Sequence, residues 1–356
     1  MEEPSVTNPS AVPQAQDGDT TATPEDLRLA LRAATLYYLD GLTQAQVADR
    51  LGVSRATAGR LVARARSHGL VRIEVMPPPH LRDDLHADIE RALEDRFGLT
   101  EAVVVGARVD DRGPVDNSAS FTALGRAAAS LLTRRLEPSD TLGFTWGPET
   151  IAVAQAIPTG IATCATIVQL DGSVTTSTYQ TGTEYVLGRC AEQLRAQPVR
   201  LPTPLYADAT TVASMRTDSV ISRTLELGAG ADVMMFGVGA VSSSTTLFEG
   251  SFLDTAMLGT LDELGAVGEI GGRFFREDGT PAHLELETRT MSTPLSDIAA
   301  CPATILVAGG ASKHRAVHGA LRGGYARMLV CDIDCAQWLL DQSPTQPHDS
   351  DRTPPK

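Results

Sequence analysis

The chain has 356 residues, 42% of them hydrophobic, and a formal net charge of −14. This length allows one small domain and one large domain with a core of its own. No run of about 18 apolar residues occurs, so the sequence predicts no membrane-spanning helix. The acidic, polar residues 1–23 lack the basic and apolar regions of a signal peptide. We expect a disordered tail there, a second one over 343–356, and a cytoplasmic protein.

The five cysteines are scattered and odd in number, which suits neither a disulfide framework nor a zinc site. They are Cys164, Cys190, Cys301, Cys331 and Cys335. We expect them to be reduced and mostly buried. The sequence indicates no metal site and no cofactor.

Residues 41–62, GLTQAQVADRLGVSRATAGRLV, have the caps, turn and apolar spacing of a helix-turn-helix. Thr43 can cap a short helix while Gln46 reaches back to it. Gly52 permits the sharp turn, and Ser54 caps a second helix that runs to about His68. An ordinary helical hairpin in a core is the alternative, but it does not require the full succession of cap, turn and cap.

A further helix over Leu27–Asp40 and a strand-like wing over Leu70–Val75 would complete a DNA-binding domain at residues 24–76. From Glu25 to Val75 there are eight arginines and no lysine against five acidic residues, so this segment is basic in an acidic chain. A specific binder of double-stranded operator DNA suits that charge distribution, because the acidic remainder would be repelled by phosphate. The exposed start of the second helix would meet base edges. The candidate DNA-binding residues are Thr43, Gln44, Ser54, Arg55, Thr57, Arg60 and Arg64.

After Pro77–Pro79 the segment His80–Phe97 resumes helical spacing, with an apolar stripe that includes Ile89 and Leu93. We expect a linker helix within residues 77–98. Its stripe could pack on the large domain or pair with the same helix of a second subunit. Formation of at least a homodimer is expected in either case.

From residue 99 to 342, short apolar runs with glycine-rich ends alternate with helical patterns, which predicts a Rossmann-like parallel α/β domain. The expected strands are Ala102–Val105, Thr141–Phe144, Thr166–Leu170, Val233–Gly237, Thr304–Ala308 and Met328–Cys331. The expected helices are Phe121–Leu136, Glu184–Ala196, Ser219–Leu227, Ser312–Leu321 and Cys335–Asp341. In such a sheet, ligands bind at the carboxyl ends of the strands.

Three glycine-containing loops follow expected strands. Gly147–Thr150 opens a helix and offers backbone N–H groups and a hydroxyl to an anion. Gly237 and Gly239 let a ligand approach the backbone, although the third glycine of a dinucleotide fingerprint is missing. Lys313 follows the third loop, and it and Lys356 are the only lysines in the chain. An isolated lysine in an arginine-rich chain indicates that a compact ammonium is needed there.

In these and other segments the chain resembles the SorC-family (DeoR-like) sugar-binding transcriptional regulators of bacteria. The resemblance extends from Leu27 to Asp341. It is carried, in family order, by LYYLDGLTQAQVADRLGVSRATAGRLVARARSHGLVRI, DTLGFTWG, IVQLDGSV, LPTPLYAD, ADVMMFGVGAV, GAVGEIGGRFFREDGTP and AGGASKHRAVHGALRGGYARMLVCD.

The resemblance implies an effector domain similar to the sugar-phosphate isomerase and glucosamine-phosphate deaminase fold. It also implies a homotetramer and a small-molecule effector, usually a phosphorylated sugar or polyol. The residues that would surround this effector are Gly147, Thr150, Gln169, Gly172, Gly237, Gly239, Glu269 and Lys313.

Two departures from the family pattern stand out. The tryptophan–glycine motif usually reaches its threonine after one residue, whereas here both Pro148 and Glu149 intervene, so Thr150 would be displaced. The added carboxylate would disfavour a nearby phosphate. Gly59 also replaces the usual serine in the second helix, and close approach of the backbone to DNA would explain it.

The competing function is that of an isomerase or deaminase acting on a sugar phosphate, with Glu269 and Lys313 as its acid–base groups. Fold analogy alone cannot establish an enzyme. The fused DNA-reading module favours the regulator, because a metabolic enzyme has no use for it. We therefore expect a non-enzymatic regulator.

Overall fold

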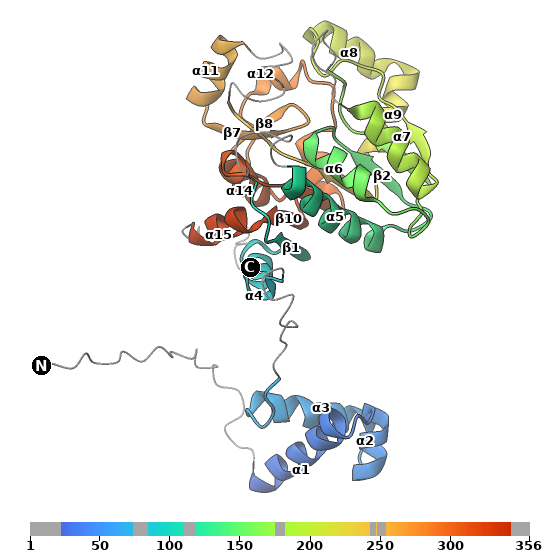
Figure 1. The fold of residues 1–356 in the computed structure, drawn as a ribbon, viewed down its shortest axis with the longest axis vertical. Helices are drawn as coiled ribbons and strands as arrows, with labels where there is room; N and C mark the ends of the chain where they lie inside the picture. Colours follow the sequence, from blue (N-terminus) through green and yellow to red (C-terminus); the bar gives the residue numbers. More distant parts are fainter. Residues whose placement is uncertain are drawn as a thin grey trace, which may run out of the picture. The chain divides into compact units, whose positions relative to one another are not determined.

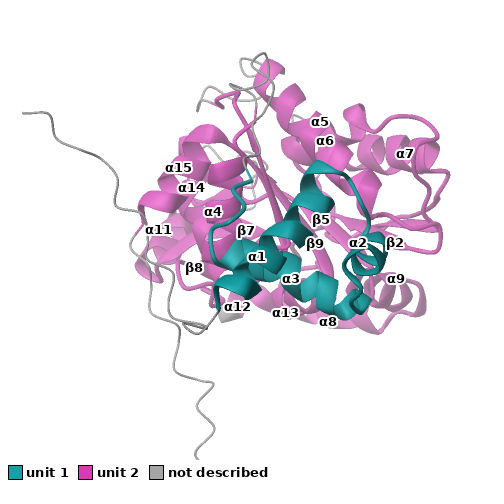
Figure 2. Cartoon of the chain, turned by 90° about the horizontal axis from the view of Figure 1, so that it is seen from below, with its two compact units in different colours: residues 1–77 teal, residues 78–356 magenta. Residues whose placement is uncertain are grey.

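The computed structural model describes residues 23–73, 85–109, 118–174, 182–242, 247 and 254–342. The chain divides into two compact units, Met1–Pro77 and Pro78–Lys356 (Figure 2). Apart from Thr23, which caps the first helix, the expected tails lie outside the described residues. No helix in the described part of the chain is long and apolar enough to cross a membrane.

The first unit consists of helices α1 (Pro24–Ala34), α2 (Gln44–Leu51) and α3 (Arg55–Ser67). A π-helical turn, η1 (Thr35–Leu39), extends α1, so the predicted first helix is confirmed. A core joins the helices. Its buried side chains are Ala30, Ala33, Ala34, Leu36, Val47, Ala48, Ala58, Leu61, Val62 and Ala65.

The helix caps and the glycine turn that the sequence predicted around α2 and α3 are confirmed. The Thr43 backbone N–H donates to Gln46 Oε1 at 2.9 Å, and the Thr43 hydroxyl accepts from the Gln46 N–H, which is a capping box. Gly52 has a φ of 66°, a left-handed conformation that few other residues adopt at low cost. Ser54 Oγ accepts from the Thr57 N–H at 3.1 Å and so caps α3.

The expected wing is wrong for the residues that the structure describes. Leu70 to Ile73 form no strand, and residues 74–75 lie outside the described residues. Gly69 ends α3 as expected, with a φ of 67°. The backbone N–H and C=O groups of a strand must pair with those of a neighbouring strand. The alternation of apolar residues in this stretch does not show whether such a neighbour is present.

The second unit is built on a seven-stranded sheet in which every neighbouring pair is parallel (Figure 1). The strand order is β1-β10-β9-β5-β2-β3-β4. The strands are β1 (Glu101–Val105), β2 (Thr141–Phe144), β3 (Thr166–Gln169), β4 (Gln197–Val199), β5 (Val233–Phe236), β9 (Ala303–Ala308) and β10 (Met328–Asp332). All six expected strands are present, and β4 was missed.

Successive side chains of each strand enter two different cores, because the side-chain period of a strand is two residues. In β5, Met234 and Phe236 belong to one core and Val233 and Met235 to the other. The second core also contains side chains of α5 (Ser118–Arg135), α6 (Pro148–Ala156) and α7 (Thr183–Leu194). The first contains side chains of α4 (Ala87–Phe97), α13 (Leu295–Ala300), α14 (His314–Arg322) and α15 (Ile333–Asp341). Burial on both faces explains why the strands read as continuous apolar runs.

The helices of the second unit match the expected helices and add others. They are α4 (Ala87–Phe97), α5 (Ser118–Arg135), α6 (Pro148–Ala156), α7 (Thr183–Leu194), α8 (Ala209–Thr217), α9 (Ser219–Ala229), α11 (Thr255–Glu263), α12 (Leu284–Glu287), α13 (Leu295–Ala300), α14 (His314–Arg322) and α15 (Ile333–Asp341). A short 3-10 helix, η3 (Ala311–Lys313), leads into α14. Gly125 lets α5 approach α6, because a side chain there would collide with the Ala152 backbone.

The apolar stripe of helix α4 packs mainly on the large domain, which is one of the two possibilities that the sequence left open. Leu93 is fully buried in the first core of the second unit, and Ile89 and Phe97 pack against it. The helix also starts later than expected, since Leu85 and His86 are not helical and residues 80–84 lie outside the described residues. Ile89, Leu93 and Phe97 are therefore covered within their own chain, whereas Leu85 is 46% exposed.

A second, antiparallel sheet of β6 (Gly239–Ala240), β7 (Ala266–Ile270) and β8 (Arg273–Arg276) was not predicted. Its strands are short and rich in glycine and charged residues, so they lack the apolar run that marked the main sheet. They pack with α11 and α12 in a separate cluster that includes Leu261, Phe274 and Leu286. Register pairs Gly239 with Glu269, which brings two predicted site residues together.

Candidate functional site

The exposed side of α3 carries the cationic groups expected to contact DNA. Arg55 and Arg60 are exposed, and Arg60 Nη2 donates to Thr57 Oγ1 at 3.2 Å. The hydroxyls of Ser54 and Thr57 lie 2.8 Å apart, so the first turn of the helix forms one polar network. The network holds Arg60 against its own helix.

The other predicted DNA-binding residues have structural roles as well. Thr43 is exposed but its hydroxyl serves the α2 cap. Gln44 packs over Gly59 of α3, and Arg64 Nη1 lies 4.0 Å from Asp26 Oδ1 of α1. Arg55 and Arg60 are thus the two exposed arginines of the predicted set.

The structure gives Gly59 no steric role within the protein. A β-carbon there would lie 3.5 Å from Gln44 Oε1, an ordinary van der Waals contact. We therefore expect Gly59→Ala to raise the free energy of unfolding of the first unit by about 1 kcal/mol, since alanine favours a helix over glycine. We also expect weaker operator binding, because the added methyl would separate the helix backbone from DNA.

Chemical unfolding followed by circular dichroism, together with operator titration, checks this prediction. Ala63→Gly, on the exposed side of the same helix, is the matched control and should lower stability by a similar amount while leaving operator affinity nearly unchanged. Unaltered operator binding by Gly59→Ala would rule out close approach as the reason for this glycine.

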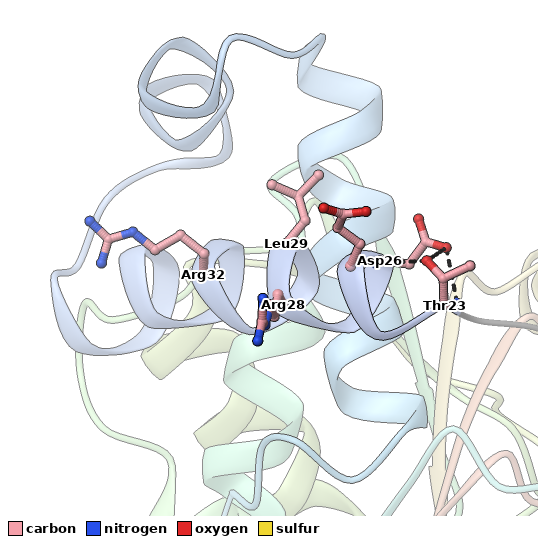
Figure 3. Close-up of a pocket in the computed structure, with 6 residues that line it drawn as sticks. Thr23, Asp26, Arg28, Leu29 and Arg32 are labelled. Atoms are coloured by element: carbon pink, nitrogen blue, oxygen red, sulfur yellow. Dashed lines mark hydrogen bonds between the residues drawn. The ribbon is translucent and has the colours of Figure 1, made fainter.

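A surface depression on α1 does not coincide with any predicted site (Figure 3). Two acidic side chains at the start of the helix and two basic side chains further along line it. It is lined by Thr23, Glu25, Asp26, Arg28, Leu29 and Arg32. The mixed charge indicates a solvated helix face, and we assign it no ligand.

The carboxyl ends of β2, β5 and β9, three neighbouring strands, bring predicted ligand residues together. The β2 loop supplies Glu149 in the first turn of α6, the β5 loop supplies Gly237, and the β9 loop supplies Lys313. Lys313 Nζ forms an ion pair with Glu149 Oε1. A β-carbon at Gly237 would lie 3.1 Å from Glu149 Oε2, so this glycine makes room for the carboxylate.

Thr150 is fully buried, and its hydroxyl donates to the Gly147 carbonyl at 2.9 Å. Gly147 has a φ of 155°, which favours glycine, and forms the start of α6. The hydroxyl closes the helix turn, and the carboxylate of Glu149 is the group that lies toward Lys313. The Thr150 hydroxyl, which the sequence analysis offered to a ligand anion, is thus bonded within its own helix turn.

Glu269 on β7 lies beside this ion pair. Its Oε2 accepts from the Gly272 N–H at 2.7 Å, and any side chain at Gly239 would collide with its Oε1. Burial raises the pKa of the Glu269 carboxyl, and the charge of Glu149 adds to this, while the Gly272 hydrogen bond and Lys313 oppose it. Six predicted residues, Gly147, Thr150, Gly237, Gly239, Glu269 and Lys313, thus gather around Glu149.

Gln169 and Gly172 organise the neighbouring loop after β3. The buried Gln169 amide donates to the Asp171 carbonyl at 2.6 Å and to Ser173 Oγ at 3.2 Å, and accepts from the Leu201 N–H at 3.3 Å. A side chain at Gly172 would collide with the Pro204 carbonyl. Both predicted residues therefore stabilise the conformation of the loop through contacts inside the protein.

Asp171 was missed by the sequence analysis. It is 1% exposed, and its Oδ1 accepts from the Trp146 N–H at 3.3 Å. Burial raises the pKa of its carboxyl well above the usual value, and the charge of Glu269 adds to this. An acidic residue directly after a predicted strand and before a glycine, as in QLDG, is the signal that could have found it.

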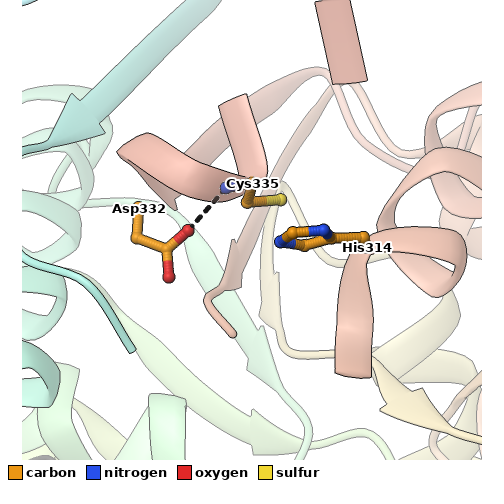
Figure 4. A group of neighbouring side chains, drawn as sticks. All are labelled: His314, Asp332 and Cys335. Atoms are coloured by element: carbon orange, nitrogen blue, oxygen red, sulfur yellow. Dashed lines mark hydrogen bonds between the residues drawn. The ribbon is translucent and has the colours of Figure 1, made fainter. Parts of the chain in front are cut away.

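His314, Asp332 and Cys335 form a cluster whose potential ligand atoms lie within 4.8 Å of one another (Figure 4). The Asp332 carboxylate accepts from the N–H groups of Cys335 at 2.8 Å, Val109 at 3.1 Å and Gly310 at 2.9 Å. A metal ion would have to compete with these bonds. We interpret Asp332 as the residue that caps α15 and positions the loop before Lys313.

A helix-turn-helix together with an α/β unit whose strand ends gather charged side chains defines a DNA-binding regulator with a ligand-binding domain. The family model described as "Putative sugar-binding domain" matches residues 84–341, and a model of sigma-70 region 4 matches residues 32–68. The chain belongs to this sugar-binding-domain family and is a transcriptional regulator of the DeoR, LsrR and SorC type.

Individual relatives agree with this assignment along nearly their whole length. The deoxyribonucleoside regulator of Bacillus subtilis (strain 168) is 32% identical over 318 residues, which are 89% of this chain and 98% of the relative. Transcriptional regulator LsrR of Escherichia coli (strain K12) is 29% identical over 87% of this chain and 93% of the relative. The full-length sorbitol operon regulator SorC of Klebsiella pneumoniae has a TM-score of 0.64 and 26% identity, covering 89% of this chain and all of that chain.

Proposed function

We propose that this protein binds operator DNA through α3 and that a sugar or polyol, free or phosphorylated, bound at the β2, β5 and β9 loops controls that binding. The observation that carries the proposal is the convergence of Glu149, Glu269 and Lys313 at neighbouring strand ends in a chain with a helix-turn-helix. Charged, mostly buried side chains at this edge are where a parallel sheet binds ligands. We propose that the protein acts in the cytoplasm.

The proposed mechanism couples two binding equilibria. Two α3 helices of a homodimer, or of each half of a homotetramer, would read successive major-groove faces of a palindromic operator. Effector binding changes the arrangement of the subunits and thereby the spacing of these helices. By linkage, operator DNA must change effector affinity by the same factor as the effector changes operator affinity, typically about 5- to 150-fold.

We propose no catalysis. An isomerase would need Glu269 and Lys313 to exchange protons with a substrate, whereas Lys313 is paired with Glu149 and Glu269 accepts a hydrogen bond from the Gly272 N–H. A thermal-shift screen of sugars and polyols, followed by operator titration with each ligand that stabilises the protein, tests the proposal. Turnover of such a ligand without any change in operator affinity would instead support the enzyme.

The Glu149–Lys313 pair gives a second prediction. Lys313→Ala should abolish the effector response, because it removes the ion pair with Glu149 that joins the loops of the site. It should also lower the free energy of unfolding by about 3–5 kcal/mol, because Glu149 is 2% exposed and would lose its partner.

The double variant Lys313→Met with Glu149→Gln separates the two effects. It leaves no unpaired charge, so most of the stability should return while the effector response stays absent. Thermal unfolding and effector titration of both variants measure this. A double variant that still responds fully to effector would place the binding site elsewhere.

A further inference from the structure

One carboxylate of the protein lies beside both features that would attract an anion to this site. The amino end of α6 presents unpaired backbone N–H groups and a partial positive charge, and Lys313 adds a full charge. Glu149 lies in the first turn of that helix and pairs with Lys313 through Oε1, while its Oε2 lies 3.1 Å from where a β-carbon at Gly237 would stand. The carboxylate is 2% exposed, so it is an internal part of the site.

The remaining charges of the site are negative. Burial raises the pKa of Asp171 and the charge of Glu269 adds to this, while the charges of Glu149 and Lys313 act on Glu269 in turn. The buried Arg273 on β8 does not offset them, because it pairs with Glu287 and donates to three backbone carbonyls. Burial already raises the pKa of Glu269 and the charge of Glu149 adds to this, so a phosphate dianion here would introduce further repulsion.

Two buried polar atoms next to Glu269 point to a ligand of another kind. Asp171 Oδ2 and Ser292 Oγ have no hydrogen-bond partner among the described residues, and their side chains are 1% and 2% exposed. Both side chains lie near Gly271, because a β-carbon there would lie 3.6 Å from Asp171 Oδ2 and 3.5 Å from the Ser292 β-carbon. Buried polar groups usually have partners, so a hydroxyl group of a ligand fits this place.

We infer that the effector is an uncharged sugar or polyol whose neighbouring hydroxyl groups donate hydrogen bonds to Glu269 and Asp171, while Glu149 fills the position that a ligand phosphate would take. Carboxylates accept hydroxyl groups in short, charge-assisted hydrogen bonds. Glu149 also keeps Lys313 neutralised, so the site discriminates against phosphate esters of the same sugar. This inference rests on the proposed function and specifies its ligand class.

Binding of inorganic phosphate to wild type, Glu149→Gln and Glu192→Gln, measured by calorimetry, tests the inference without knowledge of the effector. Glu149→Gln frees Lys313 and the α6 amino end, so its phosphate affinity should rise about 10- to 100-fold, the usual worth of a hydrogen bond to a charged group. Glu192→Gln removes the same charge from an exposed position of α7 and should match wild type. Equal phosphate affinity in all three proteins overturns the inference.

Wild-type titration with paired free and phosphorylated sugars provides a second measurement, which stands even where Glu149→Gln fails to fold. Tighter binding of the free member of a pair supports the inference, and tighter binding of the phosphorylated member overturns it. Operator titration with the same ligands separates the two proposals. A phosphorylated ligand that shifts operator affinity leaves the proposed function intact, whereas a free sugar that binds without such a shift contradicts the proposed function alone.

Discussion

Asp332→Ala should lower the free energy of unfolding by about 3–5 kcal/mol. The buried carboxylate accepts three backbone N–H groups, from α15, from Val109 and from Gly310. Loss of a helix cap costs about 1 kcal/mol, and each buried N–H left without a partner costs about 1–3 kcal/mol. Removal of a buried charge offsets part of this cost. Thermal unfolding should show a decrease in Tm of roughly 5–15 °C.

Asp334→Ala is the matched control, because Asp334 lies two residues further on and forms an exposed ion pair with Arg108. Such pairs contribute about 0–1 kcal/mol. The effector response should also weaken in Asp332→Ala, since Gly310 belongs to the loop that leads to Lys313. A stable Asp332→Ala variant that binds a divalent metal less tightly than wild type would indicate that the cluster with His314 and Cys335 is a metal site.

Arg55→Ala and Arg60→Ala should each weaken specific operator binding by about 1–3 kcal/mol, or roughly 5- to 150-fold. Both side chains are exposed at the amino-terminal part of α3, where a recognition helix meets base edges. Neither is part of the core of the first unit, so stability and effector affinity should be unchanged. Operator titration against specific and unrelated DNA measures the effect.

Arg66→Ala is the control for general attraction to phosphate, because Arg66 is exposed near the other end of α3. It should weaken binding to specific and unrelated DNA about equally and reduce the salt dependence. If Arg55→Ala and Arg60→Ala behave in the same way as Arg66→Ala, the two arginines contact phosphates and the bases are read by other residues.

The parts of the fold that the sequence predicted are those encoded by neighbouring residues. The cap at Thr43, the left-handed turn at Gly52 and the cap at Ser54 act within one helix turn, so their pattern is visible in the sequence. The strands of the main sheet are buried on both faces and stand out as apolar runs. Strand β4 was missed because Gln197–Val199 is short, lies at the sheet edge and contains Pro198.

The sequence predicted where the candidate site lies better than it predicted what each residue of the site does. Loops that follow parallel strands meet at one edge, which is why Gly237 and Lys313 lie near one another, whereas Glu269 joins them through the pairing of β6 with β7. The partner of each charge was not predictable, since Glu149 and Lys313 are 164 residues apart in the chain. Asp171 was missed for the same reason: its burial and its proximity to Glu269 depend on how β3 and β7 are brought together.

The sequence by itself determined the helix-turn-helix, the parallel α/β class and the sheet edge at which the candidate ligand residues gather, because periodicity, caps and glycine turns are short-range properties. Only the tertiary structure decided that α4 packs against the core of its own unit and that residues 70–73 form no strand. It also decided that Glu149 neutralises Lys313, while Gln169 and Gly172 support a loop from within. Ion pairs, burial and strand pairing join residues far apart in the chain, and only packing of the folded chain brings them together.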